Sequence, residues 1–165
     1  MWKLLLLPVS MAFMAPALAD LQIKAPSRAC SMLADQGLKG RKWTEYADGV
    51  SGCASNYKEI GEGVPQPNNL AFYVTGEGET VRKVKLVLNY NQPRSEAASK
   101  ASTRALATAS QKLAIRSLGT TLPKPVLTAI ERGRSIKASL GSGEVEVIRD
   151  DWPSGKGYEV HVIME

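Results

Sequence analysis

The chain has 165 residues, of which 44% are hydrophobic and 22% charged, and its formal net charge is +5. This length suits a single domain with a core of ordinary size, which needs neither metal ions nor many disulfides to hold it together. Its two cysteines and one histidine are too few for a Cys/His metal cluster, and His161 is the only side chain that could act as the base of a histidine-dependent triad.

The first nineteen residues contain the three parts of a secretory signal peptide, in order. Lys3 gives a short basic start, residues 4–14 carry no charge, and residues 17–19 read Ala-Leu-Ala before Asp20. Small residues at the first and third positions of that triplet suit the shallow pockets of a signal peptidase. The sequence therefore predicts cleavage after residue 19.

A membrane anchor is the main alternative for this segment. The apolar run over residues 4–19 contains two prolines and falls short of the ~20 residues that span a bilayer. A lipoprotein would need a cysteine directly after the run, and Cys30 comes too late. We expect cleavage near Ala19 and a periplasmic or secreted domain over residues 20–165, with no membrane segment left.

Short elements are predicted at the start of this domain. Ser27 suits the N-cap of a helix over residues 28–36, which Gly37 would end. Residues 40–49 are polar and predict a loop, and residues 50–57 predict a first strand. We expect two aromatic side chains of the loop to pack back onto the body: Trp43 and Tyr46.

The two cysteines lie on these first elements. Cys30 falls in the predicted helix and Cys53 in the predicted strand. In an oxidising compartment such a lone pair usually forms a disulfide, and a redox-active pair would more often have Cys-x-x-Cys spacing. The sequence predicts a Cys30–Cys53 bond that joins helix to strand.

The clearest strand signals lie in the middle of the chain. Residues 70–75 are rich in aromatic and branched side chains, residues 76–79 predict a tight turn, and residues 83–90 alternate between apolar and polar. This two-residue period predicts an antiparallel hairpin in which Phe72 and Leu86 lie on neighbouring strands.

Two helices should follow this hairpin. Residues 95–118 contain no glycine or proline, and Gly119 is the expected stop. The second helix should begin near Pro123 and end at Gly133. The long helix should pack on the sheet through a face rich in alanine: Ala98, Ala105, Leu106, Ala109 and Leu113.

The rest of the chain returns to strands. Residues 136–140, 145–147 and 158–164 alternate between apolar and polar side chains, with turns at 141–143 and 152–157. The glycines at 141–143 therefore predict a hairpin turn rather than a phosphate-binding loop.

Runs of strands beside runs of helices predict an α+β fold. We expect an antiparallel sheet of about five or six strands, with a short N-terminal helix and a central long helix plus a shorter helix packed on one face. This order resembles that of the secretion-chaperone-like fold, in which a central helix interrupts a sheet. The resemblance concerns element order alone and implies an architecture without a function.

Charge is distributed unevenly along the chain. Residues 94–137 sum to +7, and residues 138–165 sum to −4. A basic helical layer could meet an anionic partner, such as an acidic protein or a cell-envelope polymer. The alternative is a solvated helix flank without a partner. The candidate contact residues on the long helix are Lys100, Arg104, Lys112 and Arg116.

A second candidate contact is the turn that follows the penultimate strand. Trp152, Lys156 and Tyr158 place two aromatic rings and a lysine around two glycines. Exposed aromatic side chains on turns often make contacts with partners. The alternative is that both rings cap the end of the core.

Catalytic signals are weak. His161 sits in an alternating strand and is expected on its surface, while Asp150 and Asp151 are interpreted as turn residues. A pair of carboxylates could still converge from anywhere in the chain. The sequence predicts no catalytic, metal-binding or cofactor-binding residue, and export and the absence of a binding motif disfavour nucleic acid.

The hypothesis that follows is an exported, non-enzymatic protein that binds another macromolecule, either a protein or an anionic component of the cell envelope. Two alternatives remain open. One is a cell-envelope hydrolase that uses carboxylates the sequence does not identify. The other is an inhibitor of a foreign enzyme, which would present the Trp152 turn to its target.

Overall fold

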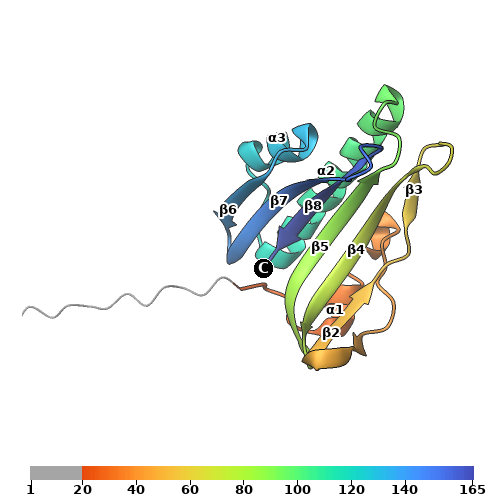
Figure 1. Cartoon of the computed structure of the whole chain (residues 1–165). Helices are drawn as coiled ribbons and strands as arrows, with labels where there is room; N and C mark the ends of the chain where they lie inside the picture. Colours follow the sequence, from red (N-terminus) through yellow and green to blue (C-terminus); the bar gives the residue numbers. More distant parts are fainter. Residues whose placement is uncertain (1–19) are drawn as a thin grey trace, which may run out of the picture.

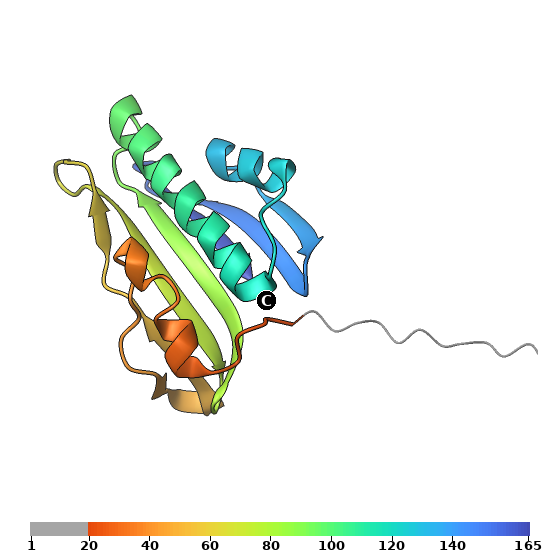
Figure 2. The same cartoon turned by 180° about the vertical axis from the view of Figure 1, so that it is seen from behind.

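A computed structural model describes residues 20–165, so the signal peptide predicted over residues 1–19 lies outside the described residues. Eight antiparallel strands form one sheet in the order β1-β2-β4-β5-β8-β7-β6, with β3 also paired to β4. The helices lie on one face of this sheet and leave the other face uncovered (Figures 1 and 2). The fold is α+β with an antiparallel sheet, as expected, but eight strands replace the predicted five or six.

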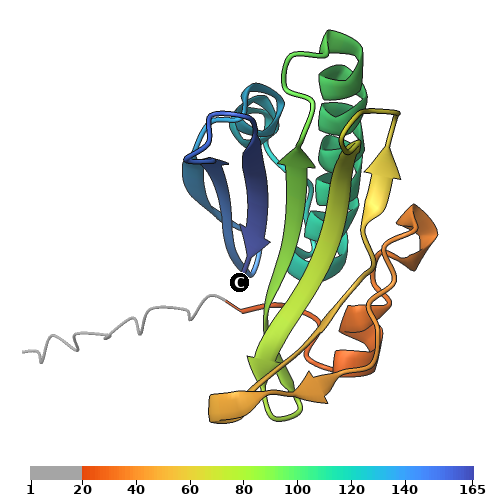
Figure 3. The same cartoon turned by 45° about the vertical axis from the view of Figure 1, so that its right-hand side comes forward.

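The first five strands include two that were not predicted. Their bounds are β1 Thr44–Glu45, β2 Val50–Ala54, β3 Lys58–Ile60, β4 Asn68–Glu77 and β5 Thr80–Tyr90. β1 and β3 are short and polar, so they carry no two-residue period from which a strand could be predicted. Figure 3 shows β4 and β5 as the long central hairpin. Phe72 faces Leu86 directly in its register, which confirms the predicted hairpin.

The last three strands are β6 Ile136–Leu140, β7 Gly143–Asp151 and β8 Tyr158–Met164. A tight turn joins β6 to β7, with Gly141 in the left-handed region at φ 60°. The interpretation of Asp150 and Asp151 as turn residues is wrong, because both pair with β8 at the end of β7. Backbone pairing extends β7 past the point where its apolar alternation ends.

The three helices are α1 Pro26–Cys30, α2 Glu96–Leu118 and α3 Lys124–Arg132. α2 confirms the predicted long helix: the Ser95 hydroxyl accepts a hydrogen bond from the amide of Ala98, and Gly119 ends the helix at φ 74°. α1 is shorter than predicted and begins at Pro26, whose preset φ suits a first helical position. A separate 3₁₀ turn, Ala34–Gln36, follows it.

Small side chains bring α2 close to the sheet. Leu106 and Leu113 are fully buried, whereas Ala105 is only half-buried. Three serines that the alanine-rich pattern did not include are also fully buried: Ser102, Ser110 and Ser117. A serine is nearly as small as an alanine, so it fits the helix–sheet interface. Ser102 accepts a hydrogen bond from Asn68 and Ser117 donates one to the Leu113 carbonyl, whereas the Ser110 hydroxyl is buried without a partner among the described residues.

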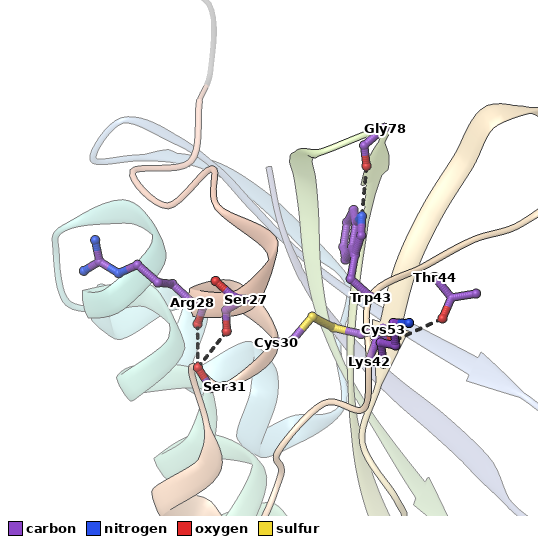
Figure 4. The surroundings of a disulfide bond; sticks show 9 residues. All are labelled: Ser27, Arg28, Cys30, Ser31, Lys42, Trp43, Thr44, Cys53 and Gly78. Carbon is purple, nitrogen blue, oxygen red and sulfur yellow. Dashed lines mark hydrogen bonds between the residues drawn. A yellow bond between two sulfur atoms is a disulfide. The ribbon is translucent and has the colours of Figure 1, made fainter.

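The Cys30–Cys53 disulfide confirms the predicted pairing and ties α1 to β2 (Figure 4). Gly40 packs tightly against it: a Cβ there would lie 2.8 Å from the Cys30 carbonyl oxygen and 2.9 Å from Cys53 Sγ. Trp43 packs back as predicted, and its Nε1 donates to the Gly78 carbonyl at 2.9 Å. Tyr46 does not pack back, since 57% of it is exposed.

Within residues 20–165, no helix combines the length and the apolar character that crossing a membrane requires.

Candidate binding site on the uncovered sheet face

Two of the four basic residues predicted as partner contacts are engaged inside the molecule. Lys112 Nζ lies 2.8 Å and Arg116 Nη1 lies 2.7 Å from carboxylate oxygens of Asp35. Arg116 also donates to the carbonyl of Met32. Hydrogen bonds from Arg116 and then Lys112 hold the pKa of Asp35 well below its usual range. These side chains fasten the 3₁₀ turn to α2.

The other two basic residues are free to meet a partner. Lys100 and Arg104 form no ion pair within the described part of the chain. They border an open hollow beside α2, which Glu131 of α3 also lines. Of the four basic residues, Lys112 and Arg116 are thus engaged in ion pairs within the described structure, and Lys100 and Arg104 are not.

The structure also separates the three residues of the predicted turn contact. Tyr158 stacks on Tyr90 with ring centroids 4.4 Å apart, and the guanidinium of Arg149 lies 3.8 Å from the centre of the Tyr158 ring. Burial raises the pKa of Tyr90 to about 12, and its hydroxyl lies 2.6 Å from Thr103 Oγ1. Tyr158 therefore packs on the core, while Lys156 is exposed and lines a different hollow.

Trp152 directly follows β7, and it lies on the uncovered face with Asn69 and Asn89. Its ring covers Gly157, where a Cβ would lie 2.5 Å from Trp152 Cζ3 and 2.5 Å from the Tyr90 carbonyl oxygen. The Trp152 amide donates to the Gly157 carbonyl at 3.1 Å, and the Gly155 amide donates to the Trp152 carbonyl at 2.8 Å. The glycines of this turn thus fix the position of the ring.

Trp152 forms one side of a depression of about 400 Å³ on the uncovered face. Volumes of about 300–1,000 Å³ are usual for small-molecule sites. The lining comes from β3, β4 and β5, from the connections before and after β3 and after β5, and from the turn that follows β7. It consists of two aromatic residues, one proline, one carboxylate and four amides: Tyr57, Trp152, Pro67, Glu59, Gln66, Asn69, Asn89 and Asn91.

The floor of the depression is a pair of asparagines on neighbouring strands. Asn69 faces Asn89 in the β4–β5 register, and Asn89 Nδ2 donates to Asn69 Oδ1 at 2.8 Å. The same row continues across the sheet through Glu59 on β3, Glu159 on β8 and Asp150 on β7. Asparagine is depleted in strands, so a cross-strand pair needs a local reason.

The rim on one side is held in place by its own hydrogen bonds. Asn91 Nδ2 donates to the Pro67 carbonyl at 2.7 Å. Gln92 Nε2 donates to the carbonyls of Val64 and Gln66 at 3.0 and 2.9 Å. These bonds tie the loop before β4 to the connection after β5, so the rim is built before any ligand arrives.

Tyr57 forms the other side of the depression. Tyr57 is 65% exposed and stands beside Tyr73 of β4. Burial, followed by the neighbouring Tyr57 hydroxyl, raises the pKa of Tyr73 to about 12. Lys85 Nζ lies 5.2 Å from the centre of the Tyr73 ring. The Tyr57 ring is thus exposed to solvent while Tyr73 lies beside it.

His161 lies on the same face, farther from the depression. Its Nε2 is 2.6 Å from a Glu159 carboxylate oxygen, and its side chain is 19% exposed. Its neighbours in register are Val87 and Ile148. Among the described residues no group of three or more His, Cys, Asp or Glu side chains could hold a metal ion.

Sequence reasoning identified Trp152 but missed the other residues that line the depression with it. The one available signal is Asn89, an asparagine inside the alternating pattern over residues 83–90, whereas Asn69 precedes the predicted strand over residues 70–75. No family model, curated protein or solved structure matches this chain.

Proposed function

We propose that this chain is an exported protein that acts by binding another macromolecule, and that the uncovered sheet face makes the contact. The observation that carries this is the depression between Tyr57 and Trp152, whose walls are an exposed tyrosine and a half-buried tryptophan and whose amides are held by hydrogen bonds. All the helices lie on the opposite face, so nothing in the described chain covers it. Aromatic side chains dominate binding energy at many interfaces.

Export is supported by the disulfide, a bond that persists in oxidising compartments. We propose that the signal peptide over residues 1–19 is removed after Ala19. Mass measurement of the exported protein should give a chain that begins at Asp20. A full-length chain retained in the cytoplasm would contradict this part of the proposal.

The test compares the two candidate surfaces against one envelope extract of the source organism. A sheet-face variant, Tyr57→Ala with Trp152→Ala, should lose the captured partner. A helix-layer variant, Lys100→Glu with Arg104→Glu, should retain it, and so should Tyr46→Ala, which removes an exposed tyrosine outside the depression.

Repeating the capture at increasing salt concentration gives a second test of which surface binds the partner. Contact through exposed charges is screened over about 8 Å at physiological ionic strength and should weaken steeply as salt rises. Contact through aromatic rings and amides should change little. The sheet-face variant could still capture the partner, and capture could instead fall with rising salt or in the helix-layer variant. That result would show that the basic layer, and not the sheet face, binds the partner.

A hydrolase of envelope material is the second candidate, and one observation favours it. Asp150 and Glu159 face each other in the β7–β8 register, on the uncovered face. Facing residues have Cβ atoms ~5 Å apart, and retaining glycosidases hold their two carboxyl groups about 5–5.5 Å apart. Asp150→Asn and Glu159→Gln separate the two functions, because a hydrolase should lose turnover through either one and a binding protein should tolerate both.

A further inference from the structure

We infer that the depression between Tyr57 and Trp152 binds a neutral saccharide chain. This inference rests on the proposed binding function and adds the chemical class of the ligand. It follows from four features of the depression: the kind of hydrogen-bonding groups on its floor, the charge of its lining, its aromatic walls, and the direction in which it opens.

The floor offers side-chain amides rather than backbone groups. The backbone of β4 and β5 is used in strand pairing at Asn69 and Asn89. The bond from Asn89 to Asn69 uses one donor and one acceptor lone pair, which leaves further N–H groups and lone pairs on both amides. A sugar hydroxyl donates and accepts hydrogen bonds at a single oxygen atom. It therefore matches a planar side-chain amide, which carries a donor N–H and an acceptor oxygen next to each other.

The charge of the lining argues against ionic ligands. Glu59 is the only charged residue among those that line the depression. The other charged residues of its row, beyond Asn69 and Asn89, are Glu159 and Asp150, which are also acidic. No lysine or arginine lines the site to neutralise a phosphate or uronate, and anionic recognition usually needs such cations. The lining therefore favours a neutral ligand over a charged one.

The aromatic walls complete the match. Tyr57 and Trp152 rise from opposite sides of the amide floor, on elements separated by β4, β5 and β8. An aromatic ring offers an apolar face beside a polar tip, and a pyranose ring likewise has apolar C–H faces with hydroxyls at its edge. Each sugar could therefore stack on a ring while its hydroxyls reach the asparagines.

An extended protein segment fits less well. Such a segment binds by adding a strand to a sheet edge, where main-chain groups are free. The strands with a free edge include β1, β3 and β6, and the depression lies over the faces of β3, β4 and β5 rather than along such an edge. A peptide seated in the depression would leave its own backbone groups to a few side chains.

The experiment titrates the purified protein with three soluble probes by calorimetry. The probes are the hexamers of glucose, of N-acetylglucosamine and of galacturonate. We expect a neutral hexamer to bind and the acidic hexamer not to bind. Preference for N-acetylglucosamine would indicate the amino-sugar chains of a cell wall, and preference for glucose would indicate an unsubstituted glucan.

Three variants locate the site. Trp152→Ala and Asn89→Thr should each weaken binding by about tenfold or more, and Tyr46→Ala, the matched tyrosine control, should leave it unchanged. Threonine is favoured in strands where asparagine is not, so Asn89→Thr should keep the fold while it removes an amide. Melting curves of every variant check this point.

The outcomes separate the ligand class from the function. Binding of the acidic hexamer alone, or neutral binding that survives both Trp152→Ala and Asn89→Thr, overturns the inference. If no hexamer binds but a protein is captured through Tyr57 and Trp152, the saccharide class is wrong and the proposed function stands. If capture is also indifferent to those two residues, both are wrong.

Discussion

Loss of the Cys30–Cys53 bond should lower stability without unfolding the protein. The bond closes a loop with a sequence separation of 23, for which the chain-entropy model gives a stabilisation of about 3 kcal/mol. For a domain of this size, that change corresponds to a fall in Tm of about 10 °C. The double variant Cys30→Ala, Cys53→Ala should show this fall in a thermal melt.

Secondary structure should change little in that variant, because α2 and the β4–β5 hairpin are held by contacts that do not involve the disulfide. The far-ultraviolet circular dichroism spectrum tests this. A reductant should lower the Tm of the natural protein and leave that of the double variant unchanged. Two free thiols per chain in the denatured, unreduced protein, or equal Tm values for protein and variant, would refute the reasoning.

Three further predictions concern single residues. Ser110 Oγ is buried without a hydrogen-bond partner, so Ser110→Ala should raise the free energy of unfolding by about 1 kcal/mol in denaturant titrations; Ser117→Ala, which removes a bond to a carbonyl, should give no gain. The pKa of Asp35 is lowered in the fold, so its stabilisation is present above its unfolded pKa of about 3.9 and is lost as pH falls through the folded value. The Tm difference between the natural protein and Asp35→Asn should therefore shrink below about pH 4, and a difference constant with pH would contradict this. Gly157→Ala should cost about 1–3 kcal/mol by overpacking and change the fluorescence of Trp152, whose ring it would strike; an unaltered melt and spectrum would contradict the packing.

Periodicity was sufficient to predict the elements with a strong apolar face. The hairpin with Phe72 opposite Leu86 and the helix ended by Gly119 both follow from local pattern. The disulfide followed because only one pairing was available. β1 and β3 were not predicted because their own side chains show no strand pattern. They are strands because their backbones pair with β2 and β4.

The candidate site could be predicted only in part, because it depends on register between distant segments. Local alternation indicates that Asn89 faces solvent. It does not indicate that Asn89 meets Asn69, which precedes the predicted strand over residues 70–75. Trp152 was recognisable as an aromatic residue on a turn, whereas its position beside Tyr57 requires the sheet order β3-β4-β5-β8-β7. A polar residue facing solvent has the same pattern whether or not it lines a site.

The basic layer illustrates the same limit for charge. Lys100, Arg104, Lys112 and Arg116 have the same sequence signature, four cations on one long helix, yet two of them are paired with Asp35 from the other end of the chain. Reversing Lys112 would place two carboxylates together and weaken the attachment of the 3₁₀ turn, so a loss of binding in that variant would report on the fold. Of these four residues, Lys100 and Arg104 are the two that can test whether the layer meets a partner, because their charges form no ion pair inside the described structure.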